Sequence, residues 1–184
     1  MQLRNTEARF GAVAQFFHWA IVALIVVQYV LAQIFEDMPL GMAKIKMIGY
    51  HKAVGMTILM LAVFRLIWRW ANPVPKLPDT LKSYERRLAH LSHFLLYLLI
   101  FAIPLSGWIM SSVAKIPVSY FGVFTFPDLV GPDKSLIDPV KEVHEILNII
   151  LLVVAAVHIA AALKHHFVLK DDVLRRMLPR FGRQ

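Results

Sequence analysis

Four uninterrupted apolar runs, each about twenty residues long, limit what this chain can fold into. A helix of about twenty residues crosses the hydrocarbon core of a membrane. The runs are continuous rather than alternating, which argues against strands, and an open sheet cannot face lipid. We therefore predict an all-α fold, an integral membrane four-helix bundle. It forms a single domain over residues 1–184, with helices at about 12–34, 47–70, 91–112 and 143–163.

The first apolar run lies close to the N-terminus, so a cleaved signal peptide is an alternative to a membrane helix. Arg4 and Arg9 would then be its charged start. The run is longer than the roughly 7–15 residues of a signal-peptide core, and no clean small-residue cleavage site follows it. We expect this run to remain as the first helix of the bundle.

The basic residues are divided unequally between the two sides of the predicted bundle. Fourteen, including Arg180 and Arg183, lie in the two tails and around the connection between the second and third runs. The other side of the bundle, which includes the loops 36–46 and 113–141, holds six basic residues together with seven acidic residues. An excess of lysine and arginine marks the cytoplasmic side. We therefore expect both termini in the cytoplasm, and the net charge of +8 requires no nucleic-acid partner.

The chain contains no cysteine, which excludes iron–sulfur clusters, disulfides and thioether-linked c-type haem. Eight histidines remain as candidate ligands. A histidine inside a membrane span is costly and is by default a candidate functional residue. The depth and the helix face of each histidine decide which of them can share a cofactor.

His144 and His158 carry the strongest signal. They lie 14 residues apart on the fourth predicted helix, which places them on one face and about 21 Å apart along the axis. Two stacked haems require two ligands arranged in this way, one near each side of the bilayer. The alternative is that both histidines only form hydrogen bonds with neighbouring helices.

Each of these two histidines has a candidate partner at its own depth. His51 begins the second helix on the outer side, level with His144, and His18 lies near the inner start of the first helix, level with His158. Two histidine ligands fill both axial positions of an iron, so such irons transfer electrons rather than bind oxygen. We predict an outer haem on His51 and His144 and an inner haem on His18 and His158.

Further polar residues lie at the inner level. His90 and His93, at the inner start of the third helix, are alternatives to His18, although an interfacial role is also open for them. Arg65 follows His51 by 14 residues on the same face, and it could pair with a haem propionate or act only as a basic membrane anchor. His165 lies two turns beyond His158 on the same face, at the inner head-group level.

Several segments together resemble the bacterial cytochrome b561 family over essentially the whole chain. They are the HW pair at His18, IGYHKAVG around His51, LAHLSHFLLYLL around His90, VHE at His144 and VHIAAALKHHF around His158.

This resemblance implies a multi-pass protein of the bacterial inner membrane, surrounded by lipid, with two haem b groups on the same histidine pairs. It implies oxidation of superoxide at the periplasmic side and reduction of ubiquinone at the inner side, near the histidine that matches His165. Histidine suits this place because it titrates near neutral pH and a quinone takes up protons when it is reduced.

The outer loops agree poorly with the family, so the resemblance does not identify the electron donor. One alternative is a non-catalytic cytochrome b subunit that passes electrons between a periplasmic redox protein and the quinone pool. A haem-free transporter is a third possibility, but four helices offer little room for a pore.

Four lysines on the outer side suit an anionic donor such as superoxide. A positive patch around His51 would steer small anions and raise their rate of association. The alternatives are that these lysines offset the seven outer acids or dock an acidic protein partner. The residues in question are Lys44, Lys46, Lys52 and Lys115.

The outer loop 113–141 is longer than most connections, and its sequence is too apolar for disorder. We expect it to form a lid over the outer end of the bundle. An aromatic belt at the membrane interface is the alternative.

Overall fold

The computed structural model of the chain describes residues 2–78 and 81–179, so Arg180 and Arg183 lie outside the described residues. Four long helices make up most of this part of the chain, and all four are long and apolar enough to cross a membrane. The predicted four-helix membrane bundle is therefore confirmed. The helices are α1 (Ala12–Glu36), α2 (Met42–Trp70), α3 (Ser83–Val113) and α4 (Ile137–Lys164).

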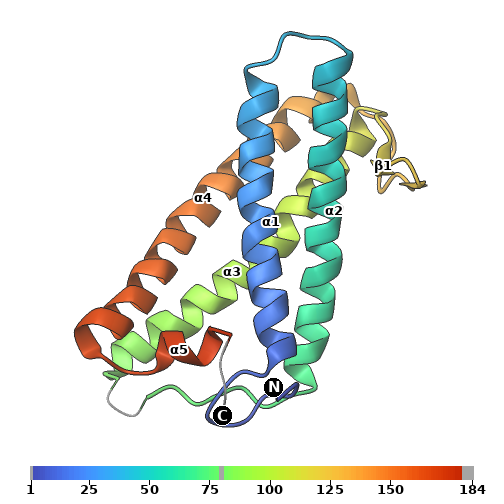
Figure 1. Ribbon diagram of the computed structural model, residues 1–184. Helices are drawn as coiled ribbons and strands as arrows, with labels where there is room; N and C mark the ends of the chain where they lie inside the picture. The colour runs from blue at the N-terminus through green and yellow to red at the C-terminus, as the bar shows by residue number, and fades with distance from the viewer. Residues whose placement is uncertain (1, 79–80, 180–184) are drawn as a thin grey trace.

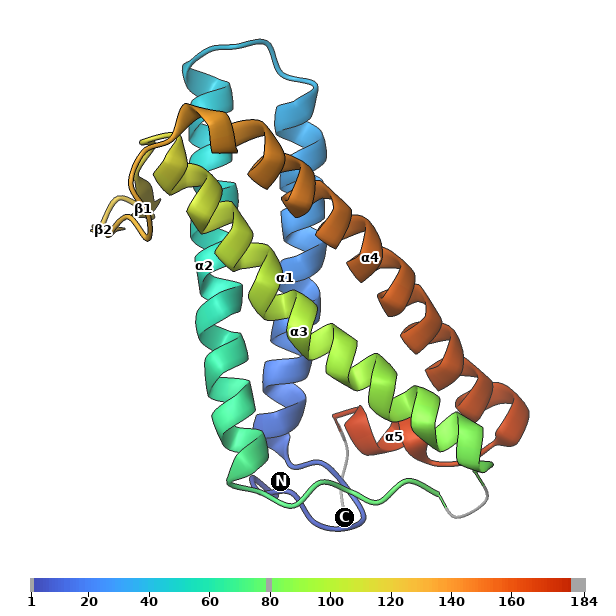
Figure 2. The same cartoon turned by 180° about the vertical axis from the view of Figure 1, so that it is seen from behind.

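The helices form two antiparallel pairs. α1 packs along α2, α4 packs along α3, and α3 also contacts α2. The two pairs meet at one end of the molecule and diverge toward the other (Figures 1 and 2). We call the divergent end the terminal end, because the described chain begins and ends there, at residues 2 and 179. We call the opposite end the hairpin end, because a short β-hairpin, residues 118–126, lies toward it. At the terminal end Arg9 Nη2 donates a hydrogen bond to the backbone oxygen of Leu178.

The helices extend beyond the predicted apolar runs. α3 begins at Ser83 rather than near residue 91. Hydrogen bonds of Glu85 hold its polar first turn in place. Glu85 accepts a hydrogen bond from the backbone N–H of Lys82 at 3.2 Å and from Lys164 Nζ at 3.0 Å. Hydropathy locates the part of a helix that lies in hydrocarbon, whereas the helix itself continues into the head-group region.

An apolar layer fills the middle of the bundle. Ile21 of α1, Val54 and Ile58 of α2 and Ile100 of α3 are buried against one another there. This layer lies between His51 and Arg65 along α2. Because α2 begins at Met42, His51 lies more than two turns inside the helix. The expectation from sequence that His51 begins this helix is therefore wrong. Many other large apolar side chains on the outside of the helices are exposed, as expected where lipid is the solvent.

The loop after α3 forms a short hairpin of two antiparallel strands, β1 (Val118–Tyr120) and β2 (Phe124–Phe126). Its turn contains Phe121 and Gly122, which both have positive φ. Such turns match the right-handed twist of a hairpin. The side chains of Phe121, Val123 and Phe124 remain exposed.

The hairpin lies against the sides of α2 and α3. It does not cover the outer end of the bundle, where we expected a lid. Thr57 Oγ1 of α2 and the Tyr120 hydroxyl are 3.3 Å apart, and Trp108 Nε1 of α3 donates to the backbone oxygen of Pro127 at 2.9 Å. Figures 1 and 2 show the hairpin projecting sideways from α2. The polar groups of Thr57 and Trp108 give this loop partners on the flank of the bundle, in the position expected of an interfacial aromatic belt.

The chain after α4 folds back across the terminal end. Gln15 Nε2 and Trp19 Nε1 of α1 donate hydrogen bonds to the backbone oxygens of Arg176 and Met177, at 3.1 and 2.9 Å. These bonds dock the last helix onto the start of the first (Figure 1). The short elements are η1 (Lys134–Leu136), the π-helical turn η2 (His165–Leu169) and α5 (Val173–Met177).

Candidate functional site

Near the hairpin end, His51 of α2 faces His144 of α4. Their ring centres lie 6.5 Å apart, with the ring planes at 71°. Two imidazoles that share one metal ion, each at a metal–nitrogen distance of about 2 Å, have ring centres roughly 6 Å apart. The structure thus brings together the pair that sequence depth predicts, at a separation that suits a shared iron.

A serine fixes the tautomer of His144. Ser106 Oγ of α3 lies 2.8 Å from His144 Nδ1 and donates its own proton to the backbone oxygen of Ile103, also at 2.8 Å. With its one proton directed to Ile103, the hydroxyl accepts the hydrogen bond of His144, and Nδ1 carries the proton. The lone pair is then on Nε2, the nitrogen free to bind a metal.

The surroundings of His51 also suit a ligand. Among the described residues, His51 Nδ1 is buried and has no hydrogen-bond partner, and the ring of Phe35 packs against the imidazole at 5.3 Å. A Cβ atom at Gly107 would lie 3.2 Å from His144 Cε1, so this glycine gives the opposite ring its space. The hairpin-end donor set therefore fits a haem held between two histidines.

Arg65 organises the second site, nearer the terminal end. Its Nη1 lies 3.0 Å from His18 Nδ1, and its Nε donates to the Tyr97 hydroxyl at 3.1 Å. An arginine can only donate, so the proton of a neutral His18 is on Nε2 in this arrangement. Ligation of iron through Nε2 therefore requires Arg65 to turn to another acceptor, and a haem propionate is an acceptor of the right kind.

Three histidines meet at this level. The rings of His93 and His158 lie 5.4 Å apart at 65°, and His18 interacts electrostatically with both of them. His90 lies on the exposed surface of α3. The structure thus brings His93 against His158, with His18 near both, and the pairing of His18 with His158 as haem ligands stays a prediction.

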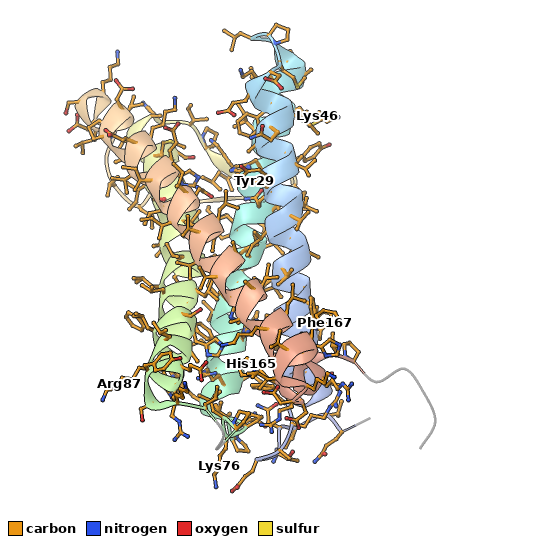
Figure 3. All side chains as sticks on the ribbon, turned by 90° about the vertical axis from the view of Figure 1, so that its left-hand side faces the viewer. Tyr29, Lys46, Lys76, Arg87, His165 and Phe167 are labelled. Carbon is orange, nitrogen blue, oxygen red and sulfur yellow. The ribbon has the colours of Figure 1, made fainter. Side chains whose placement is uncertain are left out.

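His165 lies beyond the second site, toward the same end of the molecule as Lys76 and Arg87 (Figure 3). Its Nδ1 is 2.5 Å from Asp171 Oδ2. The π-helical turn η2 and the left-handed backbone of Lys170, with φ of 54°, fold Asp171 back onto the histidine. A π turn inside or at the end of a helix is frequently found at functional sites.

Of the four outer lysines, Lys52 lies beside the first site and Lys115 lies in the loop after α3. Lys52 follows His51 directly and interacts electrostatically with it. Lys115 is exposed in the turn after α3, with φ of 55°. Lys52 is half-buried, so of these two residues Lys115 is the one that is open to an approaching anion.

The other two lysines are engaged with local groups. Lys44 Nζ donates to the backbone oxygen of Met38 at 3.1 Å, and Lys46 Nζ lies 5.8 Å from the centre of the Tyr50 ring. Figure 3 shows Lys46 at the end of the molecule opposite His165. Lys44 and Lys46 therefore contact residues near the start of α2 and do not gather with Lys52 around His51.

Sequence reasoning missed three polar partners: Ser106 for His144, Tyr97 for Arg65 and Asp171 for His165. Ser106 and Tyr97 lie on α3, whose rotation against α2 and α4 no spacing rule gives. An acidic residue shortly after a histidine at a helix end was the available signal for Asp171, but the pairing depends on the π turn.

Comparison with known proteins yields consistent matches. Residues 9–180 match the family described as prokaryotic cytochrome b561. The chain is 32% identical to cytochrome b561 homolog 2 of Escherichia coli strain K12, over 97% of this chain and 95% of that protein. It is 27% identical to cytochrome b561 homolog 1 of the same organism, over 94% and 98%. It is also 29% identical to the probable superoxide oxidase CybB of Yersinia pestis, over 89% and 92%.

Proposed function

The chain belongs to the prokaryotic cytochrome b561 family, and on this premise we propose that it is a di-haem superoxide:quinone oxidoreductase. Membrane electron transfer and a multi-pass location in the bacterial inner membrane follow from the family and the four apolar helices. The two haem b groups, the donor and the acceptor are the proposal. We place the terminal end in the cytoplasm because most of the basic residues lie there.

The first haem is proposed to lie between His51 and His144. The observation that carries this assignment is the hydrogen bond from His144 Nδ1–H to Ser106, which leaves Nε2 as the metal-binding nitrogen. A ligating histidine nearly always donates its other N–H to a partner that orients the ring. The Ser106 hydroxyl has this role.

The second haem is proposed to lie between His18 and His158, with Arg65 turned from His18 to a propionate. The guanidinium already lies 3.0 Å from His18 Nδ1, so a small movement exchanges one acceptor for another. Tyr97 stays within reach of Nε and can hold the arginine in place. When bound, the two haems would supply one-electron transfer across the bilayer.

His165 is proposed to serve the quinone at the terminal end. Reduction of ubiquinone to quinol takes up two electrons and two protons. His165 lies at the end of α4, next to the proposed cytoplasmic face, where lipid-soluble quinone and water both have access. An imidazole there can hold a quinone oxygen and supply a proton to it.

Superoxide is proposed as the electron donor, at the hairpin end. A relative in Yersinia pestis has the name probable superoxide oxidase, which supports this choice. Lys52 beside His51 and the exposed Lys115 would attract a small anion, and the one-electron product, oxygen, is neutral and leaves freely. Lys44 and Lys46 would add to the field from a greater distance.

A second candidate function is a non-catalytic cytochrome b subunit that receives electrons from a periplasmic redox protein. The spread of the four lysines favours it, because Lys44 and Lys46 interact with local groups rather than converge on His51. The exposed hairpin aromatics, Phe121 and Phe124, would then be available to a partner as well as to lipid.

Haem stoichiometry in single-histidine variants tests the cofactor assignment. The purified protein should contain two irons per chain with b-type spectra, and each ligand variant to alanine should retain one. His90→Ala is the matched control, because His90 is exposed on α3, and it should retain both. Two irons that survive the loss of His18 would move that ligand to His93, and a protein without b-type bands would overturn the di-haem proposal.

Quinone turnover in His165→Ala tests the acceptor site. We expect slow quinol formation while both haem spectra remain intact, because His165 lies seven residues beyond the proposed ligand His158. Unchanged turnover would exclude His165 from the quinone site.

A further inference from the structure

His165 and Asp171 form a close pair in the turn that follows α4. Their side chains are 15% and 20% exposed, so both are largely removed from water. The carboxylate is held on two sides, because Oδ2 meets His165 Nδ1 and Oδ1 accepts a hydrogen bond from the backbone N–H of Val173 at 3.1 Å. The backbone N–H of Asp171 in turn donates to the His165 oxygen at 3.1 Å.

A cavity of about 450 Å³ lies against Asp171, on one side of this pair. It is formed between the start of α3 and the π turn, and Glu85, Lys164, Lys170 and Asp171 line it. Lys164 and Lys170 are exposed, so the cavity opens at the terminal surface. Asp171 therefore has one face toward the cavity and the other toward His165.

The arrangement defines which nitrogen of His165 can exchange protons. Since an ionised carboxylate only accepts hydrogen bonds, the proton between the two groups belongs to His165 Nδ1. Nε2 is then the nitrogen left to exchange a proton with a substrate. When Nε2 is also protonated, the charge of the imidazolium is balanced by the carboxylate beside it.

We propose that His165 and Asp171 act as one proton-loading pair for quinone reduction, with Asp171 as the residue that positions and charge-balances the histidine. This inference rests on the quinone reduction proposed above. In each proton transfer the Nε2–H bond breaks, an O–H bond forms on the quinone, and Nε2 is reloaded from water. Two such transfers, with the two electrons from the donor, convert one quinone into one quinol.

Two substitutions at Asp171 separate its charge from its shape. Asp171→Asn keeps an oxygen that can accept from His165 Nδ1 but removes the charge, and Asp171→Ala removes both. We expect quinone turnover at least about tenfold lower in both variants, with the KM for quinone nearly unchanged. Asp172→Asn is the matched control, because this neighbouring carboxylate pairs with Arg176 and is 58% exposed, and its turnover should equal that of the wild type.

Chemical rescue distinguishes a proton-loading role from a merely structural one. The neighbouring cavity has room for a small carboxylate, so added formate should restore turnover of Asp171→Ala severalfold. Formamide, which has nearly the same shape without the charge, should not. Full turnover in Asp171→Asn, or equal effects of formate and formamide on Asp171→Ala, would overturn the inference.

A spectroscopic readout keeps the inference separate from the proposed function. The ¹⁵N resonances of His165 should show the proton of the neutral ring on Nδ1 in the wild type, with that preference lost in Asp171→Ala. If the reduced wild-type protein forms no quinol, the proposed function fails. The ¹⁵N spectra still show whether Asp171 holds the proton of His165 on Nδ1. A wild-type ring with its proton on Nε2 would overturn the inference.

Discussion

Removal of the Ser106 hydroxyl should raise the reduction potential of the haem that we propose between His51 and His144. In Ser106→Ala, His144 Nδ1–H loses its acceptor at 2.8 Å. A hydrogen bond from this N–H makes the imidazole a more basic ligand, which favours the ferric state. One neutral hydrogen bond contributes about 0.5–1.5 kcal/mol. If all of it acts on the ferric state, the midpoint rises by roughly 20–60 mV, since a tenfold change corresponds to about 59 mV for one electron.

A spectroscopic redox titration of the purified protein measures this shift. Ser111→Ala is the matched control, because Ser111 is a buried serine on the same helix whose hydroxyl donates only to the Gly107 oxygen, at 3.0 Å. The control should leave both potentials unchanged. If Ser106→Ala behaves like the control, or lowers the potential, then Ser106 does not set the tautomer of a ligand and the assignment of His144 loses its main support.

Three further outcomes are expected. His144→Ala should abolish the b-type band of the hairpin-end haem alone, and His158→Ala that of the other, as difference spectra would show. Arg65→Gln should lower the potential of the terminal-end haem, because loss of a nearby positive charge favours the ferric state, and the same redox titration measures this. Hydrogen bonds from the Ser135 side chain and backbone keep the pKa of Asp133 below its usual value. Its capping of η1 should therefore be present above about pH 3.9 and be lost as the pH falls further, and amide exchange at Ser135 would detect this.

The helices could be predicted from sequence because lipid imposes a length and a composition on each span. The four apolar runs gave the four helices, but not their ends. Polar turns such as the start of α3 at Ser83 continue the helix outside the hydrocarbon, where contacts like that between Glu85 and Lys164 decide its length. The position of the β-hairpin depends on contacts with the side chains of Thr57 and Trp108. A hydropathy pattern does not show which way these side chains point.

The histidine pairs were predictable in part, because the regular geometry of a helix fixes the face and the depth of each residue. A spacing of 14 residues repeats a helix face closely, so counting places His144 and His158 on one face of α4. Counting from the ends of the apolar runs also puts His144 at the level of His51, and the structure shows the two rings 6.5 Å apart. Partners on a third helix do not follow from counting. Whether His18 or His93 faces His158, and which serine meets His144, depends on how α3 is rotated in the bundle.

Stopped-flow mixing of the oxidised protein with superoxide, in the presence of ubiquinone, tests the central claim most directly. The account predicts rapid reduction of the b-type bands, slower as ionic strength rises because the attraction of an anion is screened. It also predicts one quinol for every two superoxide ions consumed. Slow reduction that does not vary with salt, and is unchanged when Lys44, Lys46, Lys52 and Lys115 are neutralised, would contradict it and assign the donor role to a redox protein partner.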